Sequence, residues 1–540
     1  MIRSTFSGFT TAQHALLANQ RAIDVAGQNL SNINTAGYTR QRLDLSSISP
    51  VGNSLWSSST DNKVGQGVRM MGISQIRDPF LDIQYRNQIA KVGTADATDQ
   101  ILQQIGQIFD ETDKAAIGDA LNKVISELKN VANIPNAGES SSDALVRSTF
   151  QTLINTIHQN ATKLDGVETE TIQKLTDTLI PNINKCLTGI KELNNSIKNS
   201  QILGNPSLEL QDQRNQLLDD LASYLPIQVK YKEDTTAGTK VDVLQVTFRD
   251  TDGNVHTLID DDKAAEFKLD STGGIPVSLK ITDAADPGMD NIEVSDLLGN
   301  GVLKGNLDML NKAEIFDDPT SDVRGIGYYR GLFDSFVNKM ASVMNDLNAE
   351  KDADGNITVR HDLFTTSDGS GRITASNIKV SEDWMNGKVT LKREQKEGIG
   401  GTSSSSQYDN ILLMVNALSS DKLTFTNNKQ LLDNDGNPVL DDKGNPVYET
   451  IFQGTIQGCY NNIQNIQAIE RAASSTMLEN HMTVLNQIAD SKDSVSGVSL
   501  DEEVMDLMRY QQSYNAASRL MTTLDELLDK LINSTGIIGR

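Results

Sequence analysis

The feature that most constrains this 540-residue chain is an apolar repeat with a seven-residue period at each of its two ends. Near the N-terminus, one heptad row consists of Ile2, Phe9, Leu16, Ile23 and Leu30. Near the C-terminus, two heptad rows are filled by Leu507, Tyr510, Tyr514, Ala517, Met521, Leu524, Leu528 and Leu531. Repeats of this kind predict long helices, each of which needs a partner to cover its apolar stripe.

The two terminal segments differ in charge, which favours pairing them with each other. Residues 1–42 carry four arginines against one aspartate, whereas residues 500–532 carry three basic and seven acidic residues. Opposite charges on two heptad helices influence partner choice and orientation. The alternative is that each helix docks separately on a globular core. We favour pairing because each segment is polar except for one stripe.

Between these ends the spacing of apolar residues changes several times. Residues 46–94 mix Ser, Gly and Asn with short strand-like pieces and predict an extended connector. From residue 95 to 226 apolar residues step by three and four, which predicts helices, and Pro181 within that stripe predicts a kink or a boundary. Helical spacing returns within 305–350 and at about 407–419 and 455–492, where two helices flank a short β excursion; we assign 95–226, 305–350 and 407–496 to one helical core domain.

Two segments interrupt the helical pattern with alternating apolar and polar residues, which is typical of β-strands. Residues 227–304 include a hairpin-type turn at Thr251–Asn254 and predict a β-rich inserted domain that faces outward. Residues 351–406 predict a smaller β-like excursion. The expected fold class is therefore mainly α with β insertions. It comprises a terminal coiled coil from 1–45 and 497–540, a long helical bundle domain, and the outward β-rich domain.

Charge and hydropathy exclude several functional classes. The formal net charge is −24, and such a balance argues against binding nucleic acid or an anionic membrane, both of which require a basic face. No run approaches the ~18 apolar residues of a membrane span. Polar residues also interrupt the N-terminal region, so it lacks the apolar stretch of a cleaved signal peptide.

Residues with catalytic or metal-binding chemistry do not form a recognisable set. The two cysteines, Cys186 and Cys459, form no C-x-x-C motif, and we expect buried, inert thiols whose proximity stays open. The five histidines include no pair at i, i+4, so the H-E-x-x-H zinc motif is absent. Three Asp-Gly-Asn strings predict turns first. We therefore expect no enzyme activity, no cofactor and no metal site.

Two strings at opposite ends of the chain resemble the signatures of one family. The string from Gln28 to Gln41 reads QNLSNINTAGYTRQ, and the string from Ser496 to Glu503 reads SGVSLDEE. Both resemble flagellar axial proteins, the family of rod, hook and hook–filament junction proteins, and the match is most similar to the junction branch. The residues that carry it are Asn29, Asn32, Thr35, Gly37, Tyr38, Arg40, Gln41, Ser496, Gly497, Val498, Leu500, Asp501, Glu502 and Glu503.

The resemblance implies a structural component of the bacterial flagellum, an adaptor that joins hook to filament. The implied partners are the hook protein, a second hook–filament junction protein, copies of the same chain in a ring at the hook tip, and a cytoplasmic export chaperone on the C-terminal helix. The implied location is extracellular, after export of the uncleaved chain by the flagellar type III apparatus. In such proteins the terminal helices fold on assembly.

Two alternatives remain open at this point. One is a hook or distal rod protein of the same family, which would form long polymers by itself. The other is a secreted enzyme or adhesin whose activity resides in the β insertion. We disfavour the second because residues 227–304 supply no catalytic triad, metal-ligand set or acid pair.

Overall fold

The computed structural model describes residues 6–48, 67–110, 117–133, 139–205, 207–234, 241–272, 275–282, 292–312, 324–352, 356–394, 409–430, 437–440 and 446–534. Its helices are α1 (Phe6–Ser31), α2 (Pro79–Phe109), α3 (Ile117–Asn133), α4 (Glu139–Lys174), the π-helical segment η1 (Leu175–Leu179), α5 (Ile180–Ile202), α6 (Leu208–Tyr224), α7 (Val302–Asn311), α8 (Ile326–Asn348), α9 (Glu382–Met385), α10 (Asp409–Ser419), α11 (Ile456–Ser496) and α12 (Leu500–Ser534).

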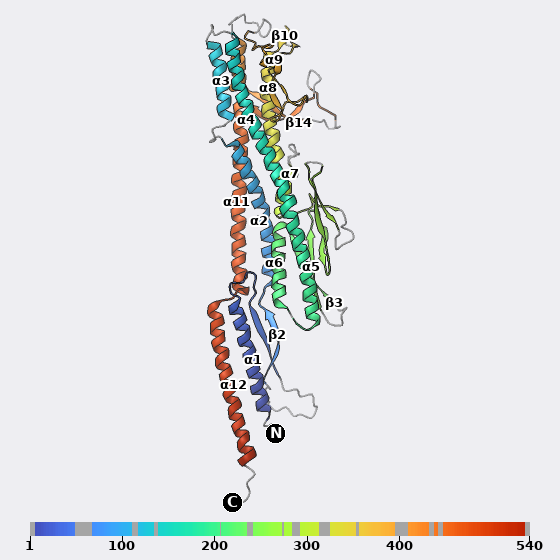
Figure 1. Cartoon of the computed structure of the whole chain (residues 1–540), viewed down its shortest axis with the longest axis vertical. Coiled ribbons are helices and arrows are strands. Elements are labelled where there is room, and N and C mark those ends of the chain that lie inside the picture. Colours follow the sequence, from blue (N-terminus) through green and yellow to red (C-terminus); the bar gives the residue numbers. More distant parts are fainter. Residues whose placement is uncertain are drawn as a thin grey trace, which may run out of the picture.

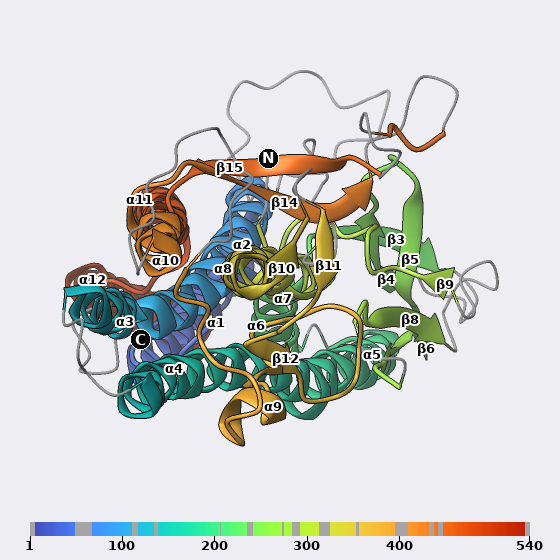
Figure 2. The ribbon, with the colours of Figure 1, turned by 90° about the horizontal axis from the view of Figure 1, so that it is seen from above.

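The strands form small antiparallel sheets. They are β1 (Gln41–Ser47), β2 (Val68–Gln75), β3 (Ile227–Asp234), β4 (Val241–Arg249), β5 (Val255–Asp260), β6 (Lys263–Ala264), β7 (Glu266–Asp270), β8 (Ser278–Thr282), β9 (Ile292–Glu293), β10 (Glu350–Lys351), β11 (Ile357–Val359), β12 (Phe364–Thr366), β13 (Ile378–Val380), β14 (Leu423–Gln430) and β15 (Tyr448–Gly454). The molecule is a rod with the larger sheets on one side, so the fold is mainly α with β insertions, as expected (Figures 1 and 2).

The two terminal helices lie side by side and antiparallel at one end of the rod (Figure 1). A Cβ atom built on Gly8, near the start of α1, would lie 3.3 Å from the methyl carbons of Leu524. Near the other end of α1, the Asn29 amide contacts the Glu503 carboxylate at the start of α12. The expected pairing of the N-terminal and C-terminal helices is therefore confirmed.

The segment between the terminal pair and the core is only partly extended. Strands β1 and β2 form a hairpin in which Gln41 lies opposite Gln75. Helix α2 then begins at Pro79, inside the range 46–94 that the sequence predicted to be extended, and that prediction is wrong for its second half. The start of α2 could have been predicted from the sequence. Asp78 is a typical N-cap residue, whose carboxylate accepts a hydrogen bond from the Phe80 amide, and proline suits the first helical turn.

Helices α4 and α5 form one continuous helical rod through the π-helical segment η1. Pro181 follows this segment directly. A proline lacks an amide hydrogen and its ring crowds the carbonyl four residues earlier, and a wider π turn relieves both problems without ending the helix. The predicted boundary at Pro181 is therefore wrong, and the proline coincides with a local change of helix type instead.

One continuous hydrophobic cluster fills the core from α2 to α11. Its aromatic centre includes Phe336, whose ring lies 6.2 Å from that of Phe333 and 5.7 Å from that of Tyr460, between ring centroids. Because α2 and α11 lie side by side along the core, residues from both halves of the sequence share this cluster (Figure 1). No described residue of α1 or α12 belongs to it, so the terminal pair is packed separately.

The inserted β domain consists of the four-stranded sheet β3-β4-β5-β6 and the three-stranded sheet β7-β8-β9. The predicted turn connects β4 to β5, where the Asp250 carboxylate accepts a hydrogen bond of 2.7 Å from the Asn254 amide. The buried face of β4, including Val246 and Phe248, belongs to the same cluster as the helical core. The insertion projects to one side, yet it shares its hydrophobic interior with the helices (Figure 2).

The described part of 351–406 is more closely joined to the core than an excursion would be. Trp384 is fully buried, and its indole N–H donates a hydrogen bond of 3.0 Å to Asp143 on α4. Its ring also packs edge-on against Phe150 and Phe364. Between α10 and α11 lies the hairpin of β14 and β15, in the place of the β excursion that the sequence predicted.

Candidate functional site: the terminal helix pair and its joint with the core

Small residues, rather than the predicted large ones, form the centre of the α1 surface that packs in the terminal pair. Ala12, Ala22 and Ala26 are buried, whereas the predicted row of Phe9, Leu16, Ile23 and Leu30 is only half-buried. Ile2 lies outside the described residues. The predicted row is therefore not the most buried one, because the small alanines let the two helix backbones approach closely and the larger side chains lie at the flank of the contact.

Most predicted seam residues of α12 do face α1. Ala517 is buried, and Leu507, Tyr510, Met521, Leu524 and Leu528 are half-buried. Tyr514 and Leu531 are 37% and 50% exposed. In this monomer, the α12 seam is thus covered on one side only, which leaves much apolar surface in contact with solvent.

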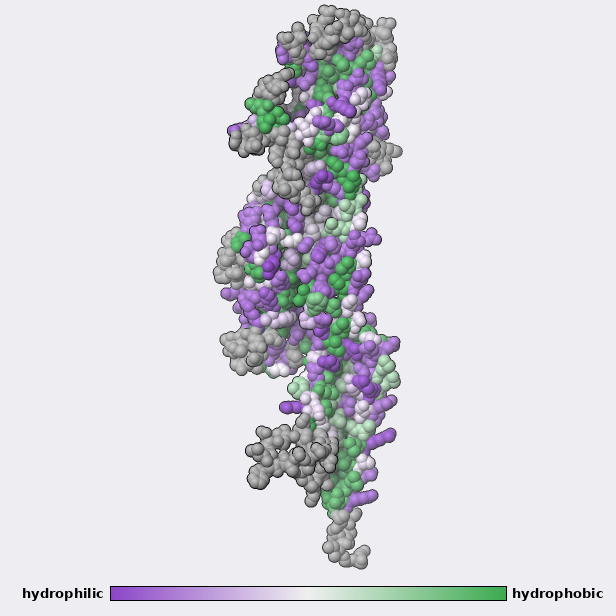
Figure 3. Space-filling model, turned by 180° about the vertical axis from the view of Figure 1, so that it is seen from behind, coloured by the Kyte–Doolittle hydropathy of each residue, from purple (hydrophilic) through white to green (hydrophobic). Residues whose placement is uncertain are grey.

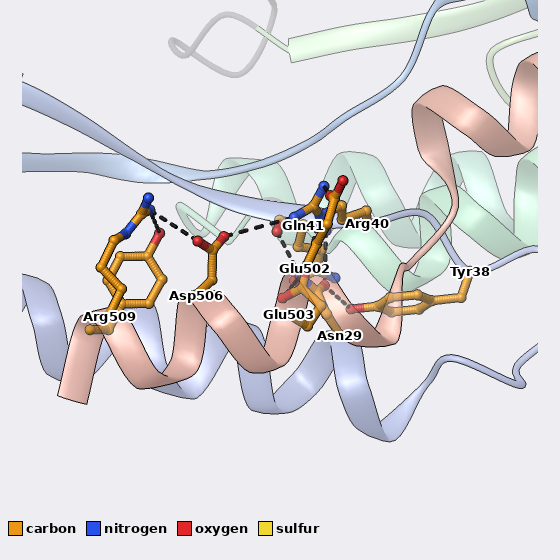
Figure 4. Close-up of polar contacts among 9 residues, drawn as sticks. Asn29, Tyr38, Arg40, Gln41, Glu502, Glu503, Asp506 and Arg509 are labelled. Atoms are coloured by element: carbon orange, nitrogen blue, oxygen red, sulfur yellow. Dashed lines mark hydrogen bonds and ion pairs between the residues drawn. The ribbon is translucent and has the colours of Figure 1, made fainter. Parts of the chain in front are cut away.

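Asn29 is the centre of the hydrogen-bond network that joins α1, β1 and α12 (Figure 4). Its side chain is 1% exposed. The amide nitrogen donates to the Gln41 carbonyl at 2.9 Å and to Glu503 Oε2 at 3.2 Å. The amide oxygen accepts from the Tyr38 hydroxyl and from the Gln41 amide, both at 2.9 Å. All polar atoms of Asn29 are satisfied, so an aliphatic replacement would leave several partners unpaired.

We refer to the network around Asn29 and Arg40 as the joint of the terminal pair. Arg40 connects this joint to the first turn of α12 by ion pairs. Its guanidinium lies 2.6 Å from Glu503 Oε1, 2.7 Å from Glu502 Oε2 and 3.8 Å from Asp506 Oδ2. Burial alone would lower the pKa of Arg40, but the Glu503 and Glu502 carboxylates raise it overall. Burial and nearby carboxylates also raise the pKa of Tyr38, which keeps its hydroxyl protonated as a donor to Asn29.

The other residues of the two signature strings line the connection around this joint. A cleft of about 590 Å³ separates the turn after α1 from the α11–α12 connection. Gly37 has a φ of +76°, which a residue with a side chain rarely adopts, so this turn requires glycine. The backbone amide of Arg40 donates to the Ser496 carbonyl at 2.9 Å. The lining residues from the strings are Asn32, Ile33, Thr35, Gly37, Tyr38, Arg40, Gly497, Val498, Ser499 and Glu502.

Two signature residues point away from the joint. Leu500 is 52% exposed at the first position of α12, and Asp501 beside it is exposed as well. Asp501, Glu502 and Glu503 together place three carboxylates in the first turn of α12, where the helix dipole favours negative charge. The structure thus brings most of the signature residues together, around Asn29 and Arg40.

A second ion-pair network, which the sequence reading missed, fixes α11 to α2 and α6 directly above the joint. Lys492 Nζ lies 2.7 Å from Asp219 Oδ2 and 3.4 Å from Asp82 Oδ1, and 4.5 Å from the centroid of the Tyr85 ring. Arg86 Nε lies 2.7 Å from Asp219. These residues are distant in sequence, and no local spacing indicates their contact. The network stiffens the part of the core to which the terminal pair is attached.

Arg77 and Asp212 connect this network to the joint. Burial would raise the pKa of Asp82, but hydrogen bonds and charge from Arg77 lower it overall. Burial raises the pKa of Asp212, whose Oδ2 accepts a hydrogen bond of 3.1 Å from the Thr39 amide, next to Arg40 in the chain. The segment that carries Arg40, directly before β1, is therefore positioned by α6 as well as by α12.

The described residues contain little that suggests catalysis or metal binding. Among them, no group of three or more His, Cys, Asp or Glu side chains could hold a metal ion. Cys186 and Cys459 are both free and buried, and burial raises the pKa of each thiol, that of Cys459 to about 12. A search of the described helices finds none with the length and hydropathy of a membrane span.

Comparison with family models places three parts of the chain. Residues 102–364 match the model described as the flagellar hook-associated protein FlgK helical domain. Residues 9–39 match that of the flagella basal body rod protein, and residues 493–534 match the C-terminal model of the flagellar basal body rod FlgEFG proteins. The two terminal matches coincide with α1, the joint and α12.

Curated relatives are similar over nearly their whole length. Flagellar hook-associated protein 1 of Bacillus subtilis is 27% identical, over 99% of this chain and 100% of the relative. The protein of the same name from Escherichia coli is 22% identical, over 97% and 98%. A solved structure titled as the flagellar hook junction protein FlgK from Burkholderia pseudomallei aligns with 77% of this chain and 100% of its own, at 13% identity and a TM-score of 0.48.

Proposed function

We propose that this chain, which is similar to flagellar hook-associated protein 1 over nearly its whole length, is a structural subunit of the bacterial flagellum that joins the hook to the filament. The observation that carries this proposal is the terminal helix pair at one end of the rod. Its seam is covered on one side only, and Arg40 with its carboxylate partners fixes it to the core. Such a pair suits a subunit that completes its packing by assembling with others.

The proposed partners follow from the same arrangement. The chain associates with hook and filament proteins of the flagellum, in keeping with the family. More specifically, it binds the tip of the hook as a ring of copies and presents a surface to a second junction protein. Before assembly, the exposed apolar surface of α12 would aggregate in water, so a cytoplasmic chaperone covers this helix until export.

The proposed route to the flagellum is export of the uncleaved chain by the flagellar type III apparatus. The similarity to flagellar hook-associated proteins over nearly the whole chain supports this route. Once outside, the chain lies at the hook–filament junction. The marginal packing of the terminal pair fits a segment that passes a narrow channel unfolded and folds on arrival.

We infer that the role is non-catalytic. The names of the relatives describe a part of the flagellum rather than an enzyme. The polar clusters in the described residues connect structural elements to one another, and the ion pairs around Arg40 and Lys492 have structural partners. The inserted β domain packs its buried face on α5 and serves as an outward-facing surface of the subunit.

A hook or distal rod protein of the same family is the second candidate. The observation that favours it is the match of both terminal segments to rod-protein models. The helical domain, which matches the hook-associated model over residues 102–364, favours the junction protein instead. The two functions differ in self-assembly, because a rod or hook protein polymerises alone whereas a junction adaptor adds only to an existing hook end.

Addition of the purified chain to isolated hooks tests the proposal. Electron microscopy should show one short cap at the hook tip and no free polymers, and capped hooks should then accept filament growth. The variant Leu524→Asp places a carboxylate in the half-buried seam and should abolish capping, because a charge without a partner is costly there. Long polymers of the wild-type chain without hooks would contradict the junction role.

The matched control is Ile469→Asp on α11, which replaces an apolar residue that is 69% exposed and lies outside the terminal pair. Both variants should show the same melting temperature of the core as the wild type, because neither residue belongs to the core cluster. In cells, Leu524→Asp should leave hooks without filaments. Export must be checked separately, by detecting the variant in the medium. Normal motility would show that the seam of α12 is not an assembly surface.

A further inference from the structure

A cleft of about 280 Å³ lies between α2 and α11 in the helical core, and none of its described lining residues belongs to α1 or α12. Two amide side chains bracket it. Gln467 donates a hydrogen bond of 2.7 Å to the Leu102 carbonyl, and Gln88 donates one of 2.9 Å to the His481 carbonyl. Between these two contacts, residues 472–475 of α11 are Ala, Ala, Ser and Ser. Their short side chains leave the space against α2 unfilled, which accounts for the cleft.

The wall of the cleft is mainly apolar. Met309 on α7 and Leu102 and Ala95 on α2 line it and are buried. Thr94 and Thr98 also line it, but their hydroxyl groups donate to main-chain carbonyls and are satisfied there. Figure 3 shows that hydrophobic side chains lie along the core as well as over the terminal pair. The interior of the cleft therefore suits an aliphatic chain.

The described lining residues include one acidic side chain, and both oxygens of its carboxylate are engaged. Glu470 on α11 accepts a hydrogen bond of 2.6 Å from the Tyr329 hydroxyl and forms an ion pair of 2.8 Å with Arg324. Burial and the nearby Glu470 carboxylate raise the pKa of Tyr329, so its hydroxyl stays protonated as a donor. The Arg324 guanidinium also lies over the Tyr328 ring, 5.0 Å from its centroid. This end of the cleft therefore carries no unpaired negative charge.

The opposite end of the cleft supplies hydrogen-bond donors. Lys91 lines it about one helical turn from Gln88, and among the described residues its exposed ammonium has no carboxylate partner. The Gln88 amide nitrogen lies 3.3 Å from His481 Nδ1. An amide nitrogen only donates, and its contact with the His481 carbonyl fixes its orientation, so Nδ1 is the acceptor. The proton of the neutral imidazole is then on Nε2, which is left as a donor.

We propose that the cleft binds a small amphipathic carboxylate. Its carboxylate lies between Lys91 Nζ and His481 Nε2, and its aliphatic chain lies against Met309 and Met477. The length of the cleft permits this placement, because Lys91 and Leu102 are eleven residues apart on α2, which is about 16 Å along the helix axis. The ligand would contact both α2 and α11. This inference goes beyond the proposed function, which requires no ligand.

Charge decides which class of amphiphile the cleft prefers. A carboxylate is attracted to Lys91 and accepts a hydrogen bond from His481, whereas an amine meets the Lys91 ammonium and finds Glu470 already paired with Arg324. An alcohol makes the same apolar contacts without a charge. The expected order of affinity is therefore carboxylate, alcohol, amine. The formal net charge of −24 would favour the amine instead, so this order distinguishes the cleft from non-specific attraction.

Titration calorimetry of the purified chain with octanoate, octanol and octylamine tests this order. Octanoate should bind at one site with a dissociation constant of about 0.1–1 mM, a modest affinity for a ligand of this size. Octanol and octylamine should each bind at least about tenfold more weakly, because neither supplies an anion to Lys91. Butyrate has the same carboxylate on a shorter chain and should also bind more weakly, because it buries less apolar area.

Two substitutions test the placement of the ligand. Lys91→Gln removes the charge at one end and should weaken octanoate binding about tenfold while leaving octanol binding unchanged. Ala473→Leu on α11 fills the cleft and should abolish the binding of both. Lys91 and Ala473 are exposed, so both variants should keep the melting temperature of the wild type. The matched control is Lys123→Gln on α3, which removes an exposed lysine outside the cleft and should bind octanoate like the wild type.

Three results would overturn the inference. They are the absence of saturable octanoate binding, an affinity for octylamine as high as that for octanoate, and an unchanged affinity in both Lys91→Gln and Ala473→Leu. The measurements use the free chain without hooks, so they are independent of the junction role. Capping of isolated hooks by the wild-type chain would support that role whichever result the titrations give.

Discussion

The helical core and the terminal helix pair use the same secondary structure but different packing. The core buries large side chains such as Phe333, Phe336 and Tyr460 in one continuous cluster. The pair buries mainly alanines on α1, and on α12 the only described residues that are buried are Glu503 and Ala517. Burial of apolar area is the main favourable term in folding, so the core is stable by itself whereas the pair depends on further contacts.

The core and the pair also differ in how many elements surround their helices (Figure 1). In the core, α2 and α11 are flanked by other helices and by sheets, whereas in the pair only the β1–β2 hairpin supplements the two helices. The pair is therefore joined to the core through a polar joint rather than through a shared hydrophobic interior. Specific polar contacts set its orientation, and under the proposed function apolar contacts with neighbouring subunits complete its packing.

Amide hydrogen exchange of the free monomer should show the largest difference between the two regions. We expect residues 6–31 and 500–534 to exchange several orders of magnitude faster than α2, α4 and α8, because isolated helices are marginal in water and their opening free energy is small. Protection of both terminal helices as strong as that of α8, in a confirmed monomer, would contradict the comparison.

Much of this contrast could be predicted from the sequence, because it depends on periodicity. The two heptad segments, the helical core and the β insertion all have the spacing of their observed structure. The prediction was wrong where packing between helices or a change of helix type overrode the pattern in the local sequence. Ala12 and Ala26 displace Phe9 from the centre of the helix contact. Pro181 is accommodated by a π turn rather than a boundary.

Of the polar contacts at the joint and in the network above it, the sequence predicted some residues and missed others. Asn29, Arg40 and Glu503 were identified by resemblance to a family signature, and the structure shows the hydrogen bonds and ion pairs that connect them. Lys492 and Asp219 lie 273 residues apart, and no spacing or motif signals their contact. Ion pairs of this kind follow from tertiary packing, so single-sequence reasoning has no access to them.

A cavity in the core should cost far more than the same change in the pair. Phe336 is fully buried, and Phe336→Ala should lower the free energy of unfolding by about 3–5 kcal/mol through lost burial and an unfilled cavity. Leu528→Ala on α12 should leave the urea midpoint of the core unchanged, because Leu528 is only half-buried and lies outside the core cluster. Equal losses in the two variants would show that core and pair unfold as one unit.

The ion pair at the joint should have an intermediate effect. Glu503 is 3% exposed and Arg40 is 20% exposed, so Arg40→Ala leaves a buried carboxylate with fewer partners. Assembly on hooks should weaken by about 2 kcal/mol, roughly thirtyfold in apparent affinity. Arg42→Ala is the matched control, since Arg42 is 65% exposed and pairs only with Asp44.

A double-mutant cycle of Arg40→Ala with Glu503→Gln separates their mutual interaction from the cost of each substitution. We expect the double variant to lose less than the sum of the two single variants, because each single change already removes the pair. Strict additivity would mean that the Arg40 side chain stabilises the joint mainly through Glu502 or Asp506.

The smallest expected effect is the pH dependence of the network above the joint. Hydrogen bonds and charge from Arg77 hold the pKa of Asp82 below its usual range in spite of burial. The ion pairs of Asp82 therefore add stability that is fully present above the unfolded pKa near ~4 and is lost as the pH falls through the folded pKa. Asp82→Asn should thus lower the free energy of unfolding at pH 7 by about 1–2 kcal/mol.

As the pH falls through the folded pKa of Asp82, the same variant should differ less and less from the wild type, because the wild-type carboxylate then loses its charge as well. Asp212 provides the control of opposite sign. Burial raises its pKa, so its charge is a cost above the unfolded pKa, and that cost is relieved as the pH falls. Asp212→Asn should therefore be neutral or slightly stabilising at pH 7, while its amide oxygen still accepts the Thr39 hydrogen bond. If Asp82→Asn were likewise neutral or stabilising at pH 7, burial rather than ion pairing would dominate at Asp82, and the network would not be what fixes α11 to α2.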